Sequence, residues 1–233
     1  KLPASSKVLF FAVCDLKQNT VDNNSGKGYV VYLKDPSGEG SEQVLLEKVQ
    51  HLGMANYFLK LDYSEDEIQD AYESFFASYP ELKNESVYAP YLMLKFRKNK
   101  EELRPEVVEF AAKMAARDDE KSLSAAYSIY RTLDKYDEME EVARVALEKY
   151  PNGEIAKMEF MGEYYSVKER DEAYITNKIE EYIAKFGTSQ KSDLDMFYYQ
   201  LILIYLDNKD TLSIAKYKDQ ISDKSLWVNM YNG

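Results

Sequence analysis

The chain has 233 residues, of which 45% are hydrophobic and 30% are charged, a composition typical of a globular protein and not of a disordered one. Its formal net charge is −11, and a diffuse acidic surface repels nucleic acid and anionic membrane, so neither is expected as a partner. No run of 18 or more apolar residues is present, and we therefore expect no membrane span.

The single cysteine and the single histidine limit the chemistry that this chain can support. One cysteine excludes an internal disulfide and a Cys–Cys redox pair, and one histidine adds too little to complete a Cys/His zinc site. Cys14 follows the apolar run at 8–13, which predicts a buried structural thiol. His51 falls in a predicted helix, and we expect it to be structural or to face solvent.

Carboxylates are plentiful, but they gather where helices are expected to begin, as at 65–67 and 138–141. Acidic residues there favour the helix dipole and stay solvated, so they need no acid–base pair to explain them. The chain has no phosphate-binding glycine loop and no motif that would activate a serine or lysine as a nucleophile. We expect no enzyme activity, no cofactor and no metal in this chain.

The first 40 residues differ from the rest of the chain. Residues 7–14 and 29–33 are apolar, β-branched and aromatic, which predicts two strands, and residues 22–28 between them are rich in turn formers. Two strands are too few to be stable alone, so either they dock on the helices or they are the last strands of an upstream sheet. We favour the second interpretation and assign residues 1–40 to the remnant of an upstream β-domain.

From Ser41 onward the apolar residues follow a helical period. In the segment that starts at Ser64 they fall at offsets of 0, 3, 4, 7, 8 and 11 from Ile68, and Pro80 ends the helix. Related patterns start at 104, 139 and 175, so successive starts lie 36, 35 and 36 residues apart.

A second set of helical faces lies between those of the first set. Its starts, which lie 35, 35 and 36 residues apart, are Tyr88, Leu123, Met158 and Leu194. The third of these faces is predicted to contain Met158, Met161, Gly162 and Tyr165. Two helices in each repeat of about 35 residues predict a helical solenoid in which each hairpin packs on the next.

Residues 41–233 are therefore expected to form five helix pairs and the start of a sixth. Leu226, Trp227 and Met230 would begin the sixth repeat, with Trp227 packed on the preceding pair. Four side chains on the two sets of faces should be nearly inaccessible to solvent, namely Phe75, Tyr130, Ala146 and Leu201.

One copy of this pattern resembles a tetratricopeptide repeat. It reads Leu123-x2-Ala126-Tyr127-x2-Tyr130 and then Met139-x3-Ala143-x2-Ala146-x4-Pro151, with large, small, tyrosine and closing proline positions in the order of that family. The chain departs from the family at the first position, which is never tryptophan, and at Gly187, which replaces the proline in the fourth copy. The resemblance covers roughly residues 41–233 and implies a mainly α fold, a right-handed α-α superhelix that follows a short N-terminal β-hairpin.

A second resemblance is carried by residues 22–29, Asp-Asn-Asn-Ser-Gly-Lys-Gly-Tyr, after an apolar strand and before a helical repeat array. This order resembles secreted TlpA-like redoxin proteins, in which a β-sandwich precedes a helical region and a thioredoxin domain with a Cys-x-x-Cys motif follows. The resemblance implies an extracytoplasmic protein, periplasmic or at the cell surface, of which this chain is the middle region. The chain has no such motif, so no redox residue can be assigned.

Two functional interpretations stay open. In the first, the chain is a non-catalytic scaffold whose partner is a protein, a peptide or a neighbouring domain of the same polypeptide, and a homodimer is compatible with this. In the second, it is the accessory part of a thiol–disulfide oxidoreductase whose catalytic domain lies outside this chain.

The tetratricopeptide pattern also predicts where a ligand would lie, because the first helix of each pair lines the groove in that family. The mix of one cation and several acids at these positions favours a polar ligand, or one that tolerates basic residues, over an apolar helix. The inward positions would be Ser124, Ser128, Arg131, Glu159, Glu163, Asp195 and Tyr199.

Overall fold

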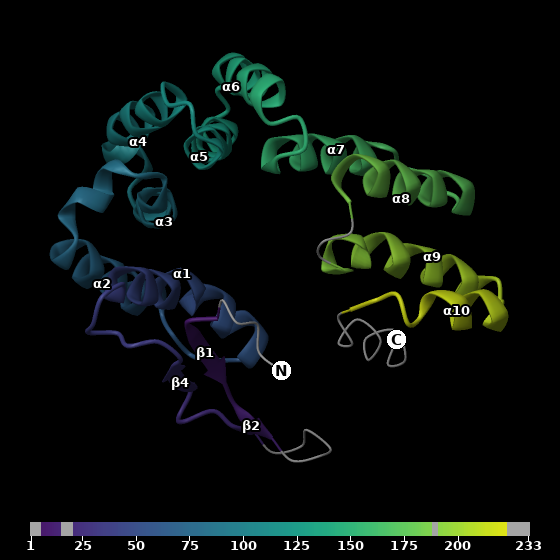
Figure 1. The fold of residues 1–233 in the computed structure, drawn as a ribbon, viewed down its shortest axis with the longest axis horizontal. Coiled ribbons are helices and arrows are strands. Elements are labelled where there is room, and N and C mark those ends of the chain that lie inside the picture. The colour runs from purple at the N-terminus through teal and green to yellow at the C-terminus, as the bar shows by residue number, and fades with distance from the viewer. Residues whose placement is uncertain (1–5, 15–20, 188–190, 223–233) are drawn as a thin grey trace. The chain divides into compact units, whose positions relative to one another are not determined.

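The computed structural model describes residues 6–14, 21–187 and 191–222. Within these residues ten α-helices follow four short strands, so the protein is mainly helical, as the periodicity predicted (Figure 1). None of these helices contains a stretch long and apolar enough to cross a membrane. The chain divides into two compact units, residues 1–142 and residues 143–233.

The first unit contains the strands and the first five helices. The strands are β1 (Val8–Phe11), β2 (Val13–Cys14), β3 (Val21–Asp22) and β4 (Tyr29–Tyr32). The helices are α1 (Ser41–Leu59), α2 (Glu65–Ser78), α3 (Ala89–Lys98), α4 (Lys100–Ala115) and α5 (Glu120–Thr132), with 3₁₀ turns at Pro80–Asn84 and Ser86–Tyr88. The predicted strands at 7–14 and 29–33 are confirmed, since β1 and β4 pair antiparallel with Val8 opposite Tyr32.

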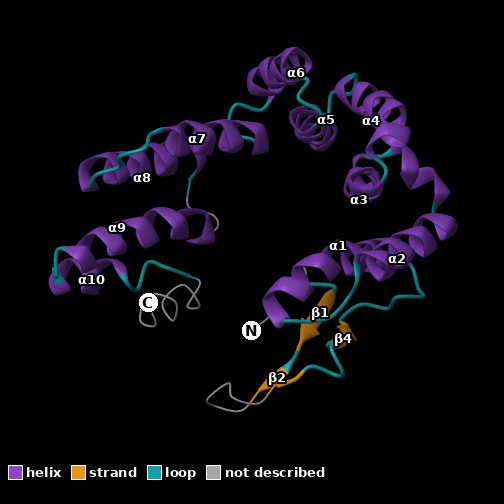
Figure 2. Ribbon diagram, turned by 180° about the vertical axis from the view of Figure 1, so that it is seen from behind, coloured by secondary structure: helices purple, strands orange, loops and turns teal. Residues whose placement is uncertain are grey.

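The β1–β4 hairpin docks on α1 (Figure 2). Lys7 Nζ donates a hydrogen bond of 2.6 Å to Glu47, and Lys48 Nζ lies 5.8 Å from the centre of the Tyr32 ring. These contacts match the first of the two alternatives, in which the strands dock on the helices. The assignment of residues 1–40 to a larger upstream β-domain stays a prediction.

Cys14 is exposed, and the prediction of a buried thiol was wrong. The residue lies on the short β2–β3 ladder, where Cys14 is opposite Val21 and where Val13 is 53% exposed. Helix α1 packs against β1, whereas β2 and β3 lie at the far end of the hairpin (Figure 1). An apolar run in the sequence therefore did not imply burial here, because the run extends past the edge of the helix that covers it.

The turn at 22–28 packs against the loop between α1 and α2, and we call these two segments, residues 22–28 and 60–62, the hairpin clamp. Asp62 N donates to Gly26 O at 2.6 Å, and Asn23 Nδ2 donates to Lys60 O at 3.2 Å. Lys27 Nζ reaches both Asp62 O, at 3.1 Å, and the Glu67 carboxylate, at 2.5 Å. The residues that carry the resemblance to redoxin proteins thus join the hairpin to the first helix pair.

The clamp should weaken in acid. The hydrogen bond from Lys27, together with the backbone N–H of Ser64, lowers the pKa of Glu67 from 4.5 to about 2. A lowered pKa gives stability that is present above pH 4.5 and is lost as the pH falls towards 2. We expect Glu67→Gln to be less stable than the wild type above that window and to lose less stability within it. Melting temperatures at about pH 5 and about pH 3 measure this, and equal losses in both proteins would contradict it.

The helices of the first unit pack in sequence order, α1 on α2, α2 on α3, α3 on α4 and α4 on α5. In addition, α3 contacts α5, so the first helices of two successive pairs lie against each other. Phe75 and Tyr130 are each only 5% exposed, as predicted. The capping box at Ser64 and Glu67 begins α2 where the sequence indicated a helix start.

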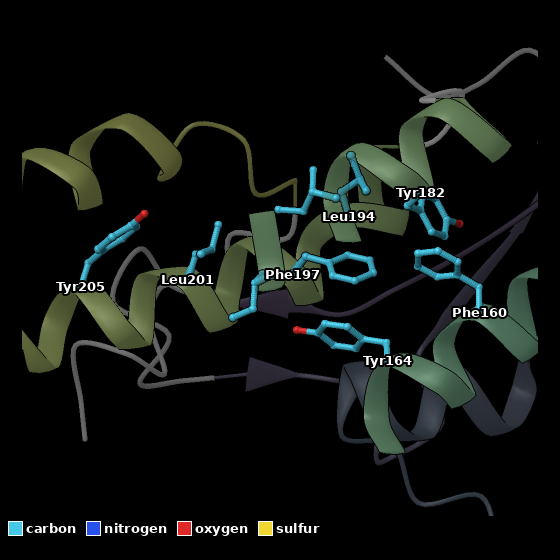
Figure 3. Close-up of a cluster of buried hydrophobic side chains, with 9 residues drawn as sticks. Phe160, Tyr164, Tyr182, Leu194, Phe197, Leu201 and Tyr205 are labelled. Carbon is cyan, nitrogen blue, oxygen red and sulfur yellow. The ribbon is translucent and has the colours of Figure 1, made fainter. Parts of the chain in front are cut away.

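The second unit contains α7 (Glu154–Ser166), α8 (Glu172–Phe186), α9 (Asp195–Asp207) and α10 (Thr211–Tyr217), with a 3₁₀ turn at Lys191–Leu194, and α6 (Tyr136–Lys149) contributes to both units. Its core is an aromatic cluster in which the rings of Phe160, Tyr164 and Tyr182 surround Phe197 (Figure 3). Ala146 and Leu201 are 2% and 0% exposed, which confirms their predicted burial.

The buried face of α7 differs from the predicted one. The face at Met158, Met161, Gly162 and Tyr165 is only partly covered, and Tyr165 is 46% exposed. The buried residues of α7 are instead Ile155, Ala156, Phe160 and Tyr164. The apolar residues of α7 lie on several sides of the helix, so the period alone did not select a buried face. The orientation of α7 is instead set by Tyr164, whose ring packs on Phe197, and by Phe160, whose ring packs on Tyr182.

The predicted start of a sixth repeat at Leu226, Trp227 and Met230 lies outside the described residues. Immediately before that segment, Ile221 is buried, and Ser222 donates hydrogen bonds from its backbone N and its Oγ to Asp195, at 2.8 Å and 2.6 Å. This contact ties the chain that follows α10 to the start of α9.

Candidate binding groove

A groove of about 420 Å³ lies between α3 and α5 in the first unit. Its α3 wall consists of Ala89, Pro90, Met93 and Arg97, with Ser86 just before the helix. Its α5 wall consists of Ser124, Ala125, Ser128, Ile129 and Thr132. On each helix these residues recur about one turn apart, so the groove follows the helix axes.

The two walls are related by the repeat. Each of the four α3 residues lies 35 residues before an α5 residue that lines the opposite wall, in the pairs Ala89 and Ser124, Pro90 and Ala125, Met93 and Ser128, and Arg97 and Thr132. The period that was found from the core residues therefore also relates the residues that line the groove. Equivalent positions in two successive first helices form the groove.

Local sequence explains why Ser124 and Ser128 line the groove and do not belong to the buried face of α5. On α5 the buried face contains Leu123, Tyr127 and Tyr130, and Ser124 and Ser128 each lie one residue further around the helix. The Asp119 side chain accepts a hydrogen bond from Ser122 N at 2.9 Å and fixes where α5 begins. Small side chains on both walls leave space between the helices, which larger residues would fill.

The hydroxyl groups of the groove differ in their hydrogen bonds. Thr132 Oγ1 donates to Ser128 O at 2.9 Å. Ser124 Oγ is shielded from solvent and has no hydrogen-bond partner among the described residues. A buried hydroxyl without a partner costs roughly 1–3 kcal/mol.

Arg97 is the one charged residue among those that line the groove. Its side chain is 67% exposed, and its guanidinium lies 4.0 Å from the carboxylate of Glu65, whose side chain is 57% exposed. An exposed pair at this distance contributes little, typically below about 1 kcal/mol. The neighbouring Lys98, in contrast, binds both Asp66 and Gln69. The Arg97 guanidinium is therefore the cation that a ligand in the groove can reach.

Two of the seven predicted site residues lie in this groove. Ser124 and Ser128 line it, and that they contact a ligand stays a prediction. Arg131 is exposed on α5 but does not line the groove. The other four residues belong to the second unit.

Those four residues have different environments. Glu159 is exposed on α7, and Tyr199 is half-buried on α9. Lys178 donates hydrogen bonds to Glu163, at 2.8 Å, and to Glu181, at 2.7 Å, and these two bonds raise the pKa of the buried Lys178 ammonium. Asp195 is 5% exposed and holds Ser222, so its carboxylate serves the fold of the second unit.

None of the residues of the α3 wall is among the predicted site residues. The predicted inward positions begin at Ser124, although a shift of 35 residues back from Ser124 and Ser128 leads to Ala89 and Met93. The same shift leads from Thr132 to Arg97. The repeat period itself was thus the signal that could have found these residues.

The lining of the groove suits binding, since it contains apolar side chains, hydroxyls and one cation, and no cysteine, histidine or carboxylate. Within the described parts of the chain, no group of three or more His, Cys, Asp or Glu residues is placed to hold a metal ion.

Comparisons of the chain with protein-family models, with curated proteins and with solved structures found no match in any of the three.

Proposed function

We propose that this chain is a helical-repeat scaffold of tetratricopeptide type that binds an extended peptide segment of a partner protein in the groove between α3 and α5. The observation that carries the proposal is the repeat relation between the two walls, because first helices at equivalent positions form the binding face in that family. A right-handed superhelix is part of the proposal and follows from the same resemblance.

The shape of the groove favours an extended peptide. The lining residues of α3 run from Ala89 to Arg97, which is about two turns or roughly 12 Å along the helix axis. An extended chain rises about 3.3 Å per residue, so about four residues of a peptide span this length. The small side chains at Ala89, Ala125 and Ser124 let a peptide backbone approach, and the hydroxyls can bond its N–H and C=O groups.

A groove-filling variant tests this proposal. A displayed library of random peptides is selected on the full chain, and the selected peptides are then titrated against Ala125→Trp. We expect binding to weaken by at least about tenfold, equivalent to 1.4 kcal/mol, because the indole would occupy the space between the walls. Ala112→Trp, at an exposed position on α4, is the matched control and should bind as the wild type does. Equal binding to Ala125→Trp, with an unchanged melting temperature, would exclude the groove.

A second proposal concerns the longer protein. We infer that this chain is the middle region of an extracytoplasmic TlpA-like protein and serves a thiol–disulfide oxidoreductase domain encoded beyond it. The docking of β1 on α1, and of the turn at 22–28 on the loop between α1 and α2, supports this, since strands that lead directly into a helical array are the order found in that family. The reading frame on either side of these residues tests it, and the absence of a Cys-x-x-Cys domain would contradict it.

A further inference from the structure

We infer that the peptide bound in the groove carries a carboxylate against Arg97 and an apolar side chain between Met93 and Ile129. These two side chains belong to peptide residues that lie two positions apart in the peptide sequence. This inference rests on the proposed function and adds the chemistry of the partner.

The carboxylate is assigned from the charge of the lining. Arg97 is the one ionisable side chain among the lining residues, and its existing contact with Glu65 is long and solvent-exposed. A guanidinium binds a carboxylate through two parallel hydrogen bonds, which are stronger than a single exposed contact at 4.0 Å. A ligand carboxylate would therefore displace Glu65 or share the guanidinium with it.

The net charge of −11 favours a basic partner at long range, but this effect is small within the groove. At physiological ionic strength charges are screened beyond about 8 Å, so the group in direct contact with the ligand decides the preference. The acidic residues among the predicted inward positions, on which the expectation of a basic-tolerant ligand rested, do not line this groove. Glu163 instead binds Lys178, and Asp195 binds Ser222. An acidic peptide is the occupant that the lining fits.

The spacing of the two ligand features follows from the helix. Met93 lies one turn before Arg97 on α3, and Ile129 lies at the matching height beside Ser128 on α5. The four residues from Met93 to Arg97 advance about 6 Å along the helix, which an extended peptide covers in about two residues. Beyond Met93 the walls carry Ala89 and Ala125, where the peptide needs only a small side chain.

Three pools of synthetic peptides test the inference. Each pool consists of acetylated and amidated heptapeptides that carry Leu and, two positions away in either direction, Asp, Asn or Lys, with Ala and Ser at the other positions. Fluorescence anisotropy against the full chain should show the Asp pool binding about tenfold tighter than the Asn pool and tighter still than the Lys pool. Arg97→Glu should reverse the order of the Asp and Lys pools, whereas Arg104→Glu, at an exposed arginine on α4, should leave the order unchanged.

Each result either supports or overturns the inference. An Asp pool that binds no tighter than the Lys pool, the absence of binding by any pool, or an order that Arg97→Glu does not alter would overturn it. Arg97→Gln, which keeps the length and removes only the charge, should erase the preference and replaces Arg97→Glu if that variant does not fold. If Ala125→Trp abolishes binding while both Arg97 variants keep the order, this inference fails and the groove remains the site. If the pools bind Ala125→Trp as they bind the wild type, the groove itself is excluded.

Discussion

Phe197→Ala is expected to lower the free energy of unfolding of the second unit by about 3–5 kcal/mol. The Phe197 ring is fully buried, and its centre lies 4.7 Å from that of Tyr164 and 5.8 Å from that of Tyr182. Removal of the ring leaves a cavity that three helices line, and aromatic partners lose edge contacts that alanine cannot replace. Urea unfolding followed by hydrogen exchange in α7, α8 and α9 measures the loss.

Leu212→Ala is the control for this prediction. Leu212 lies on α10 of the same unit and is 84% exposed, so its truncation should change the free energy of unfolding by less than about 0.5 kcal/mol. Equal effects of the two substitutions would show that the aromatic cluster does not form the core of this unit.

Gly26→Ala is expected to destabilise the first unit by about 2–3 kcal/mol. Gly26 has a φ of +83°, which alanine rarely adopts, and an added Cβ would lie 2.5 Å from Asp62 Oδ2 and 3.0 Å from Asp62 Cβ. The carboxylate can rotate away, but the Cβ of Asp62 can move only with its backbone, whose N–H bonds Gly26 O. The substitution therefore strains the hairpin clamp on both sides.

Gly53→Ala should have the opposite effect. Gly53 lies inside α1, and an added Cβ would meet no atom within 4 Å, so alanine gains helix propensity worth up to about 1 kcal/mol. Melting of both variants, with hydrogen exchange at α1 and β4, measures the difference. A Gly26→Ala protein as stable as Gly53→Ala would show that the clamp does not hold the hairpin on the helices.

Where one helical face is clearly the most apolar, the buried residues were predictable from the sequence. Around Phe75, Tyr130 and Ala146 the period of 35 residues selects one face, and each of these side chains is buried. Leu201 is also buried as predicted, although apolar residues lie on most sides of α9. The prediction was wrong for α7, because its apolar residues do not favour one face, and for Cys14, because the extent of the covering helix is a tertiary property.

The candidate groove was only half predictable for a related reason. Its α5 wall was found at Ser124 and Ser128 from the family pattern. Its α3 wall requires knowledge that α3 and α5 contact each other, and only the packing of successive repeats supplies that. The charge of the groove depends on one residue, Arg97, and the acids at other inward positions hid it.

The methionine methyl groups of the chain can report whether a peptide binds between α3 and α5. Met93 lines the groove, whereas Met54 on α1 and Met196 on α9 are 54% and 41% exposed at other sites. The full chain labelled with ¹³C at its eight methionine methyl groups, with each resonance assigned by a Met→Leu variant, is titrated with the Asp pool. We predict that the Met93 resonance shifts with added peptide while those of Met54 and Met196 stay in place. An unmoved Met93 resonance under conditions where the peptide binds would show that the peptide does not lie between α3 and α5.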